Sequence, residues 1–318
     1  MYSVVNISYK RVMENKSYAI LKSNKDKLKK AIFFEDNIEK YYSVAFFVEE
    51  ENDCVICVSS QVGCTERCMF CATGDQPFIR NLSRDEIVSE LQIGMKMISD
   101  MVSELDNKQI SVIFEGMGEA SHNIENCFAA FDYVYPTLSE KFNKIVLRVA
   151  SSGNVDLCRK YLDFFFSRKD KCQNVSFQVK LSLHTPYEKE RKYLMPNISK
   201  RYSLENIISS FEELAKSLGT KLICNYVMFS YPNGGNNYSA KHAIELVKCI
   251  NRDTMKITLG QYSETGKGFA SPEEREYRLF LYYLSDKCSI ETDVVKLYGQ
   301  DINAACGMLN YQIDKVRL

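Results

Sequence analysis

Three cysteines stand close together in one short stretch of the sequence. Cys64, Cys68 and Cys71 form a C-x3-C-x2-C loop. Three thiolates on so short a loop can each bind one iron of a cubane [4Fe–4S] cluster. The fourth iron then has no protein ligand, and it can chelate the amino and carboxylate groups of S-adenosylmethionine. One electron from the cluster would cleave the C5'–S bond of that cofactor and release a 5'-deoxyadenosyl radical.

Zinc is the other metal that such cysteines could hold. A structural zinc site normally takes four ligands in two pairs, and these three thiols leave its tetrahedron incomplete. The loop also follows a strand-like run at residues 53–58. A (β/α) barrel builds its active site at the C-terminal ends of its strands, where this loop would lie. We therefore expect an iron–sulfur cluster rather than zinc.

The composition indicates a globular protein without general affinity for nucleic acid. The chain has 318 residues, of which 45% are apolar and 26% charged, and its formal net charge is zero. This length fits one large α/β domain or two modest ones. A protein with general affinity for nucleic acid is strongly basic. A net charge of zero leaves only local basic patches for contacts with nucleic acid.

The twelve cysteines and the N-terminal sequence point to a reducing compartment. Residues 1–16 lack the long apolar run of a secretory signal peptide. No run approaches the roughly 18 apolar residues that a transmembrane helix needs. We expect a cytoplasmic protein that does not enter a membrane, whose thiols serve metal binding or chemistry rather than structural disulfides.

The order of predicted elements indicates an α/β fold. Strand-like runs recur at 54–59, 110–115, 144–150, 174–183, 222–229 and 255–259. A helical pattern follows each of them; Ser83 with Glu86 makes a capping box at the start of the first helix, and Gly219 ends the fourth. Six such units predict a partial (β/α)6 barrel over residues 51–318, open enough at one side for a macromolecular substrate.

The first 50 residues differ from the rest. Basic residues dominate up to position 30: Lys10, Arg11, Lys16, Lys22, Lys25, Lys27, Lys29 and Lys30. Short strands are expected at 18–21 and 43–48. We predict that residues 1–50 form a small β-rich extension with a basic surface, which serves equally well as a solvated face or as an RNA contact.

Polar or glycine-rich motifs follow several of the predicted strands. Residues 116–119 read GMGE, in which glycine allows backbone to approach a ligand and Glu119 offers negative charge to an amino group. An ordinary tight turn is the alternative. His184 ends the fourth strand, although a lone histidine is more often structural than a ligand. Cys57 and Cys306, each taken alone, would be ordinary buried thiols.

Taken together, the chain from about residue 44 to its end resembles the RlmN/Cfr family. These are radical SAM methyltransferases that methylate adenosine carbons in ribosomal RNA and, for some members, transfer RNA. The matching segments, in chain order, are CVSSQVGC, CATG-x5-RNL, GMGE, SSG, SLH, LMP, YVM and DINAACG.

The resemblance implies a radical SAM barrel and a mechanism with two further cysteines. Cys306 matches the cysteine that a first S-adenosylmethionine methylates. The radical made from a second one takes hydrogen from that methyl group, and the resulting methylene radical adds to adenine. Cys57 matches the thiol that then attacks the Cys306 sulfur and releases the product by forming a disulfide.

The resemblance also implies which residues contact S-adenosylmethionine. Family contacts match residues in the GMGE, SSG and SLH motifs: Met117, Gly118, Glu119, Ser151, Ser182, Leu183 and His184.

Some family features are not matched. The family's catalytic glutamate aligns with Ser43 or Val44, and a serine that contacts S-adenosylmethionine aligns with Ala150. The helical RNA-binding domain that precedes the barrel in the family has no counterpart in residues 1–50.

Three functions follow as hypotheses. The first is methylation of adenine C2 or C8 in ribosomal or transfer RNA, with electrons from a reducing partner such as flavodoxin or ferredoxin. The second is the same two-cysteine chemistry on a non-RNA or partner-delivered substrate. The third is a non-catalytic iron–sulfur module that binds RNA or protein. The pair Cys57 and Cys306 favours the first and, together with the GMGE and SLH motifs, counts against the third.

Overall fold

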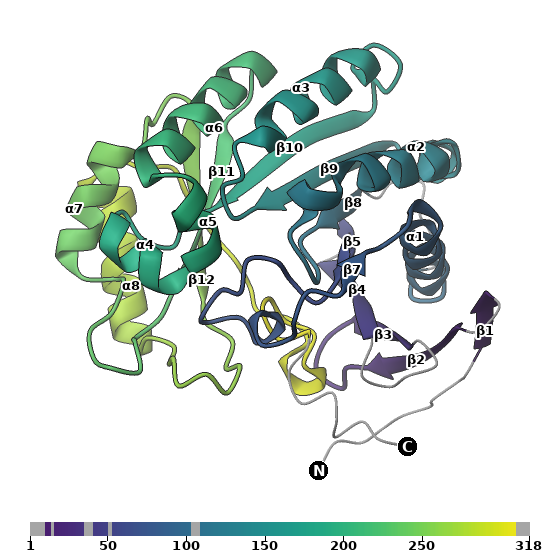
Figure 1. Ribbon diagram of the computed structural model, residues 1–318, viewed down its shortest axis with the longest axis horizontal. Helices are drawn as coiled ribbons and strands as arrows, with labels where there is room; N and C mark the ends of the chain where they lie inside the picture. Colours follow the sequence, from purple (N-terminus) through teal and green to yellow (C-terminus); the bar gives the residue numbers. More distant parts are fainter. Residues whose placement is uncertain (1–9, 14–15, 35–40, 50–52, 103–108, 310–318) are drawn as a thin grey trace.

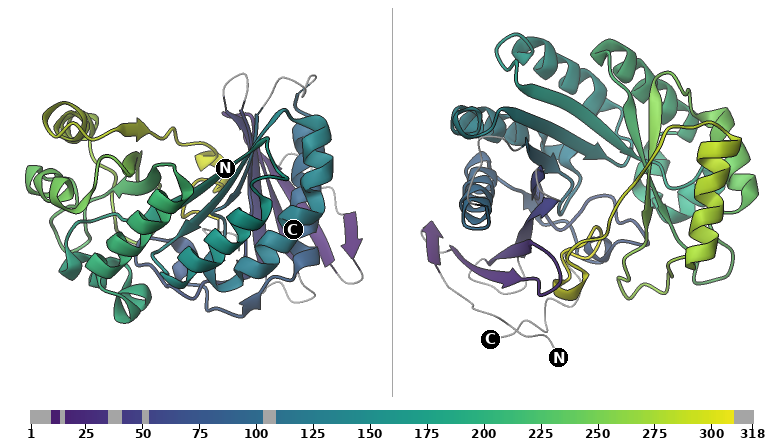
Figure 2. Two further views of the ribbon diagram at one scale, coloured as in Figure 1. Left: turned by 90° about the horizontal axis from the view of Figure 1, so that it is seen from above. Right: turned by 180° about the vertical axis from the view of Figure 1, so that it is seen from behind.

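The computed structural model describes residues 10–13, 16–34, 41–49, 53–102 and 109–309. Within these residues an 11-stranded sheet has the order β1-β2-β3-β4-β5-β8-β9-β10-β11-β12-β13. The sheet is strongly curved, and its long helices cover the outer, convex face (Figures 1 and 2). In the part of the chain that is described, no helix is long and apolar enough to cross a membrane.

The strands are β1 (Lys10–Met13), β2 (Lys16–Lys22), β3 (Leu28–Phe34), β4 (Tyr41–Glu49), β5 (Asp53–Cys57), β6 (Gln61–Val62), β7 (Arg80–Asn81), β8 (Gln109–Phe114), β9 (Lys144–Ser151), β10 (Val175–Ser182), β11 (Leu222–Met228), β12 (Met255–Gln261) and β13 (Thr292–Val294). The α-helices are α1 (Arg84–Ser99), α2 (Ile124–Lys141), α3 (Asp156–Arg168), α4 (Glu188–Leu194), α5 (Pro196–Arg201), α6 (Leu204–Leu218), α7 (Ala240–Cys249) and α8 (Glu274–Tyr282). Shorter helical turns are η1 (Ala72–Gly74), η2 (Ala120–Asn123), η3 (Tyr283–Lys287) and η4 (Gln300–Ile302).

The strands from β5 onward form the predicted partial barrel. Within the described residues of the large sheet, each strand from β5 onward pairs in parallel with its neighbour, from β5–β8 through β12–β13; β6 and β7 form a separate small sheet. Helices make the crossovers, as parallel pairing requires. β1 and β13 are the two edges of the described sheet, so the barrel remains open between them. The (β/α)6 prediction is therefore confirmed.

Helix α1 shows why the helices begin where they do. The Ser83 hydroxyl accepts a hydrogen bond from the Glu86 N–H, and the Glu86 carboxylate accepts one from the Ser83 N–H. This is the predicted capping box. Ile87, Leu91 and Ile98 recur at helical spacing, are buried, and pack toward β4 and β5. The helix thus covers the outer face of the first barrel strand.

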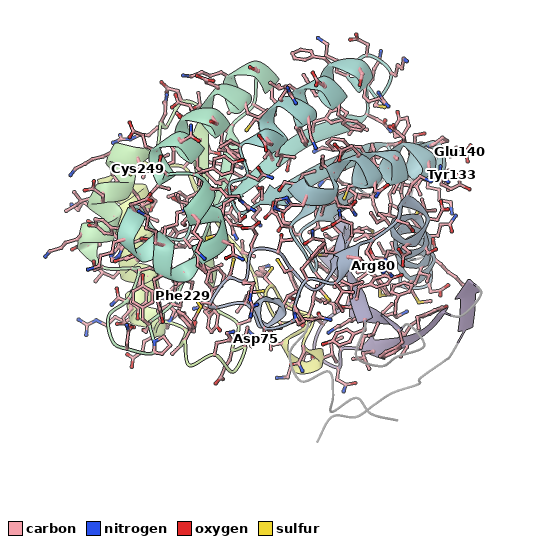
Figure 3. All side chains as sticks on the ribbon, viewed as in Figure 1. Asp75, Arg80, Tyr133, Glu140, Phe229 and Cys249 are labelled. Atoms are coloured by element: carbon pink, nitrogen blue, oxygen red, sulfur yellow. The ribbon has the colours of Figure 1, made fainter. Side chains whose placement is uncertain are left out.

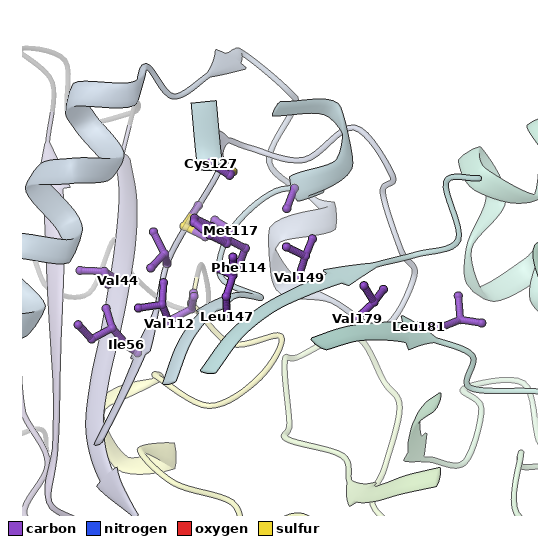
Figure 4. Close-up of a cluster of buried hydrophobic side chains, with 14 of the residues drawn as sticks. Val44, Ile56, Val112, Phe114, Met117, Cys127, Leu147, Val149, Val179 and Leu181 are labelled. Carbon is purple, nitrogen blue, oxygen red and sulfur yellow. The ribbon is translucent and has the colours of Figure 1, made fainter. Parts of the chain in front are cut away.

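The hydrophobic core lies between the sheet and these helices. Figure 4 shows outward-facing side chains from neighbouring strands, among them Val112, Leu147 and Val179, packed into one cluster. Successive residues of a strand point to opposite faces. Their neighbours Arg148 and Lys180 therefore face the inner side, where both line a cavity. The inner face of this barrel is polar.

The sequence pattern does not predict three of the elements. Helices α4 and α5 have seven and six residues, too few to show a helical period. Strand β3 carries Lys29 and Lys30 in succession, which hides the alternation of a half-buried strand. In the structure Lys30 is buried rather than part of the predicted basic surface, whereas Lys22, Lys25 and Lys27 are exposed.

The N-terminal strands continue the barrel sheet. β4 pairs antiparallel with β5, placing Ala45 opposite Cys57, and β1 to β3 follow as antiparallel neighbours. The strands expected at 18–21 and 43–48 lie within β2 and β4. The side chains of Lys10, Arg11 and Lys16 lie outside the described ones. The division into residues 1–50 and 51–318 stays a prediction.

The N-terminal strands also hold the segment that carries Cys306. The Lys30 ammonium donates hydrogen bonds to the carbonyls of Asn303 and Leu309, at 2.9 and 2.8 Å. Nearby, Asp301 accepts hydrogen bonds from the Ser23 hydroxyl and the Asn24 N–H. Cys306 lies between the two carbonyls that Lys30 binds. The extension therefore positions Cys306 although they are far apart in the sequence.

Removing the ammonium of Lys30 should loosen this segment. In Lys30→Met the two carbonyls lose their donor, which costs roughly 1–3 kcal/mol for each buried group. Hydrogen exchange across residues 299–309 should become faster than in the wild type. Lys29→Met, on the opposite face of β3, should leave that exchange unchanged. Equal exchange in Lys30→Met and wild type would show that Lys30 does not hold the segment.

The contribution of Lys30 should also depend on pH. Burial lowers the pKa of Lys30 to about 7. An unfolded lysine has a pKa of about 10.4, so the folded protein binds fewer protons than the unfolded one between these values. The cost of burying Lys30 therefore shrinks as the pH rises through this range. Urea unfolding should give wild type a larger stability advantage over Lys30→Met at about pH 9 than at about pH 7; a smaller advantage contradicts this reasoning.

Candidate active site

The cysteine loop lies at the edge where the parallel strands end. β6 and β7 pair antiparallel and close the base of the loop between them. Gly63 turns the chain with φ 77°, and a Cβ there would lie 2.0 Å from the Pro77 carbonyl oxygen. Only glycine fits that position. Figure 3 labels Asp75 and Arg80 in the returning half of the loop.

Contacts on two sides fix the loop. The Glu66 carboxylate accepts a hydrogen bond from His122 Nε2 at 2.8 Å and pairs with Arg201 of α5. On the other side, the Ala72 N–H donates to the Gly307 carbonyl at 2.9 Å. Figure 1 shows the C-terminal segment, in yellow, running beside the loop, in blue. The loop is thereby placed next to Cys306.

The three loop thiols are close enough to influence one another. Burial raises the pKa of Cys64 to about 12 and the pKa of Cys68 well above its usual value, and the charge of Cys71 raises both further. Within the described residues no set of three or more His, Cys, Asp or Glu converges on a single metal ion. The donor set is three neighbouring thiols on one loop, and each thiolate of such a set can bind its own iron of a cluster.

A zinc pair can be excluded on the preceding strand. Cys54 and Cys57 also have C-x2-C spacing, but an odd separation along a strand sends side chains to opposite faces. Cys54 is fully buried in the core, whereas Cys57 lines the inner cavity. All twelve cysteines are described, and all are free thiols.

The GMGE turn places a carboxylate between two strand ends. Gly118 has φ 96°, and a Cβ there would lie 2.5 Å from the Gln61 Cβ. Glu119 is buried; its carboxylate accepts hydrogen bonds from the Ser121 hydroxyl at 2.6 Å and the Ser152 N–H at 2.8 Å. Its charge raises the pKa of Cys64, so the carboxylate faces the cysteine loop.

Met117 and Ser151, two other residues predicted to contact the cofactor, make hydrogen bonds within the protein. The Met117 side chain lies in the core (Figure 4), its N–H donates to the Ser59 hydroxyl, and its carbonyl accepts from the Ser60 N–H. The Ser151 hydroxyl accepts from the N–H groups of Gly153 and Asn154 at 3.1 Å each. Both residues shape the turns beside the loop, and their contact with a cofactor stays a prediction.

The SLH motif brings a neutral histidine to the end of β10. His184 has φ 59°, and its Nδ1 accepts a hydrogen bond from the Val227 N–H at 3.1 Å. Burial, followed by the charges of Arg191 and Lys180, lowers the pKa of His184 to about 3. The proton of the neutral ring is therefore on Nε2. Ser182 and Leu183 contribute their carbonyls to the same strand end, as acceptors for Arg191.

Arg191 is a buried cation that the sequence analysis missed. Its guanidinium donates to the carbonyls of Ser152, Ser182 and Leu183, which joins the ends of β9 and β10. Burial lowers the pKa of Arg191 to about 10, so it remains charged at neutral pH. It lies near the Cys68 and Glu119 side chains. Helix α4, which carries Arg191, is too short to show a helical period in the sequence. We find no sequence signal that would have identified Arg191 as buried.

Aromatic rings pack against Phe70 of the cysteine loop. Phe70 stacks on Phe229 with ring centroids 5.2 Å apart and contacts His184 edge-on at 5.0 Å. The Tyr262 hydroxyl donates to the Phe70 carbonyl at 3.0 Å. Figure 3 labels Phe229, which follows β11. The ends of β10, β11 and β12 thus all contact one residue of the loop.

A cavity of ≈ 1170 Å³ occupies the inner side of the sheet. Cys57 from β5, Cys71 from the loop and Cys306 from the C-terminal segment all line it. Cys306 is exposed because its side chain faces this open space. The structure therefore brings the predicted catalytic cysteines together with one of the predicted metal ligands.

A buried ion pair lies in the same cavity. Lys180 Nζ is 3.0 Å from Glu115 Oε2, and the two side chains are 9% and 10% exposed. Loss of water around the two sulfurs raises the pKa of Cys57 and of Cys306, even though Cys306 faces the open cavity. The charge of Glu115 raises both pKa values further, and the charge of Lys180 lowers them. Glu115 Oε1 has no hydrogen-bond partner among the described residues. The sequence analysis named neither member of this pair.

A solved structure shares this fold. A radical SAM methyltransferase from Sphaerobacter thermophilus superposes with a TM-score of 0.77 at 22% sequence identity. The superposition covers 95% of this chain and 80% of that chain. No family model matches the sequence.

Curated proteins show the family. The dual-specificity RNA methyltransferase RlmN of Pseudomonas fluorescens is 29% identical over 266 residues, which are 82% of this chain and 65% of that protein. The protein of the same name from Francisella tularensis subsp. holarctica is 31% identical over 266 residues, which are 83% of this chain and 68% of that protein. The chain spans about two thirds of the length of these relatives. On this identity and coverage, the chain belongs to the RlmN family.

Proposed function

We propose that the protein is a radical SAM methyltransferase that methylates an adenine carbon, C2 or C8, in ribosomal or transfer RNA. The observation that carries this proposal is the convergence of Cys57, Cys71 and Cys306 in one cavity. They come from the first barrel strand, the cysteine loop and the C-terminal segment. Three thiols from such distant parts of the chain would not need to share a cavity if each were an ordinary core residue.

The loop and the strand ends would hold the cofactors. A [4Fe–4S] cluster at Cys64, Cys68 and Cys71, with S-adenosylmethionine bound to it, supplies a carbon radical that abstracts hydrogen. Glu119 offers negative charge toward the amino group of the methionyl moiety, and Arg191 keeps a cation beside the loop. The aromatic residues around Phe70 keep water away from this side of the site.

The cavity would hold the carbon chemistry. Cys306 faces open space, where it can receive a methyl group and then carry it to a substrate base. Cys57 lines the same cavity and would attack the Cys306 sulfur to release the product. The disulfide so formed would be transient, and the reducing thiols of the cytoplasm would return it to two thiols. A flavodoxin or ferredoxin would supply the electron.

The position that aligns with the family's catalytic glutamate cannot supply a base. Ser43 and Val44 of β4 are fully buried, and the Ser43 hydroxyl lies against the Met117 sulfur at 3.5 Å. His184 is also unsuitable, because its Nδ1 is already an acceptor for a backbone N–H. The proton acceptor of this chain must therefore be another group.

The metal assignment can be tested by removing one ligand. Cys68→Ala should lose the brown colour and iron of the anaerobically purified protein together with 5'-deoxyadenosine formation, because two thiolates do not hold the cluster. Cys54→Ala removes a buried thiol from the core and is the matched control; it should keep both. Metal analysis that finds zinc bound by sulfur, with no uptake of iron, would overturn the radical mechanism.

The two-cysteine mechanism can be tested by trapping the substrate. In Cys57→Ala no thiolate remains to displace the product, so the substrate should stay bonded to Cys306. Mass spectrometry of the peptide containing Cys306, from protein purified out of cells, should find a nuclease-sensitive added mass. Sequencing the attached fragment then identifies the RNA.

Other outcomes of the trapping experiment are equally informative. A small, nuclease-resistant mass on Cys306 would support a non-RNA substrate. Normal turnover of Cys57→Ala without an added mass would remove Cys57 from the mechanism. Cys54→Ala again serves as control and should carry no adduct, because Cys54 faces the core rather than the cavity.

A further inference from the structure

Glu115 lines the same cavity as Cys57 and Cys306, and its charge acts on both thiols. Ile113 of β8 pairs with Cys57 of β5, and Glu115 lies two residues farther on the same inner face. The Gly116 N–H donates to the Val58 carbonyl at 3.0 Å, and a Cβ at Gly116 would lie 2.6 Å from that carbonyl oxygen. The absence of a side chain at Gly116 lets the end of β8 approach β5 closely. Glu115 is thereby held next to Cys57.

The two oxygens of Glu115 differ in their surroundings. Oε2 binds Lys180 of β10, whereas Oε1 is buried without a hydrogen-bond partner among the described residues. β9 lies between the two strands, and there Lys180 is level with Ala150, whose small side chain leaves room for the ion pair. A buried carboxylate oxygen without a partner is costly, and such groups commonly mark a functional site.

Another carboxylate near Cys57 is a poorer proton acceptor. Glu90 of α1 is fully buried and also has one unpartnered oxygen, but it does not line the cavity. Burial raises the pKa of Glu90 well above its usual value, and its Oε2 accepts from the Ser59 N–H. Glu90 lies outside the cavity that the two cysteines share. Glu115 differs because Lys180 pairs with it and it faces both cysteines.

We propose that Oε1 of Glu115 takes the proton of the Cys57 thiol as Cys57 attacks the Cys306 sulfur, and then returns that proton to the released carbon. This inference rests on the proposed two-cysteine function. It assigns a catalytic carboxylate to β8, whereas the position that aligns with the family's catalytic glutamate, Ser43 or Val44 of β4, carries no carboxylate.

The step balances without an outside reagent. The S–H bond of Cys57 breaks, its electron pair stays on sulfur, and its proton moves to Glu115. The new S–S bond to Cys306 forms as the bond between Cys306 sulfur and the substrate methylene breaks. That electron pair remains on the methylene carbon, which takes the proton from Glu115 and becomes a methyl group. The thiol sulfur of Cys57 and the thioether sulfur of Cys306 are oxidised to a disulfide, and the methylene carbon is reduced by the same two electrons.

Lys180 has a supporting role in this step. Its ammonium favours the thiolate form of Cys57, opposing the effect of burial on the pKa of that thiol. It also orients Glu115 by binding Oε2, so that Oε1 is left for the thiol proton. Lys180 acts through its neighbours and is a positioning residue.

The inference can be tested with a substitution that keeps the shape of Glu115. Glu115→Gln, purified from cells as the full chain, should carry the substrate adduct on Cys306, with Cys57 still present. Losing a general base slows a step by about 10²- to 10⁴-fold, so the fraction of Cys306 peptide with added mass should rise at least about tenfold over wild type. Glu115→Asp keeps a carboxylate, so its fraction of Cys306 peptide with added mass should lie between those of Glu115→Gln and wild type. Glu90→Gln, the matched control, should resemble wild type.

A second measurement separates proton transfer from a structural effect. The isolated adduct of Glu115→Gln should decay far more slowly under anaerobic incubation than that of Glu115→Asp, while both variants keep wild-type iron content. Glu115→Gln alone leaves the charge of Lys180 unpaired, and this could impair folding. The double variant Glu115→Gln with Lys180→Met replaces both members of the ion pair by neutral groups, and it should also accumulate adduct.

The outcomes distinguish this inference from the proposed function. Wild-type adduct levels in Glu115→Gln, with Cys57→Ala still trapping substrate, would overturn the role of Glu115 and leave the two-cysteine mechanism standing. Normal turnover of Cys57→Ala without adduct would instead refute the two-cysteine mechanism itself. Accumulation in Glu90→Gln to the same level as in Glu115→Gln would show a general effect of buried charge and would also overturn the inference.

Discussion

Parallel pairing of the strands from β5 to β13 is the constraint on which the site depends. It brings the carboxyl ends of these strands to one edge of the sheet, where the cysteine loop, the GMGE turn and His184 follow them. Alternation along each strand then sends every second side chain inward. Cys57, Glu115 and Lys180 share a cavity because of that alternation, and their neighbours fill the core (Figure 4).

Buried charges connect parts of the chain that are distant in sequence. An unpaired charge in the interior carries a desolvation penalty of several kcal/mol, so each must find close partners. Lys30 finds two carbonyls on either side of Cys306, and Arg191 finds three at the ends of β9 and β10. These contacts replace water with fixed acceptors. They hold the C-terminal segment and the strand ends in the positions that the chemistry requires.

The site has two sides that meet at one backbone contact. On one side the loop and its aromatic support form a dry surface around Phe70 and His184. On the other, an open polar cavity contains Cys57 and Cys306. The hydrogen bond from Ala72 to Gly307 joins them, so a group bound at the loop lies close to Cys306. Separate surroundings suit a radical that must avoid water and thiols that must exchange protons.

The sequence alone determined the local features: the cysteine loop by its spacing, the six β/α units by their periodicity, and the α1 capping box by Ser83 and Glu86. Such signals depend on neighbours along the chain. Only the tertiary structure decided that Lys30 holds the Cys306 segment, that Arg191 joins two strand ends, and that Glu115 pairs with Lys180. The physical reason is that burial and charge pairing between distant segments leave no periodic trace in the sequence, because any strand or helix position can carry a lysine or glutamate until the fold decides which face is buried.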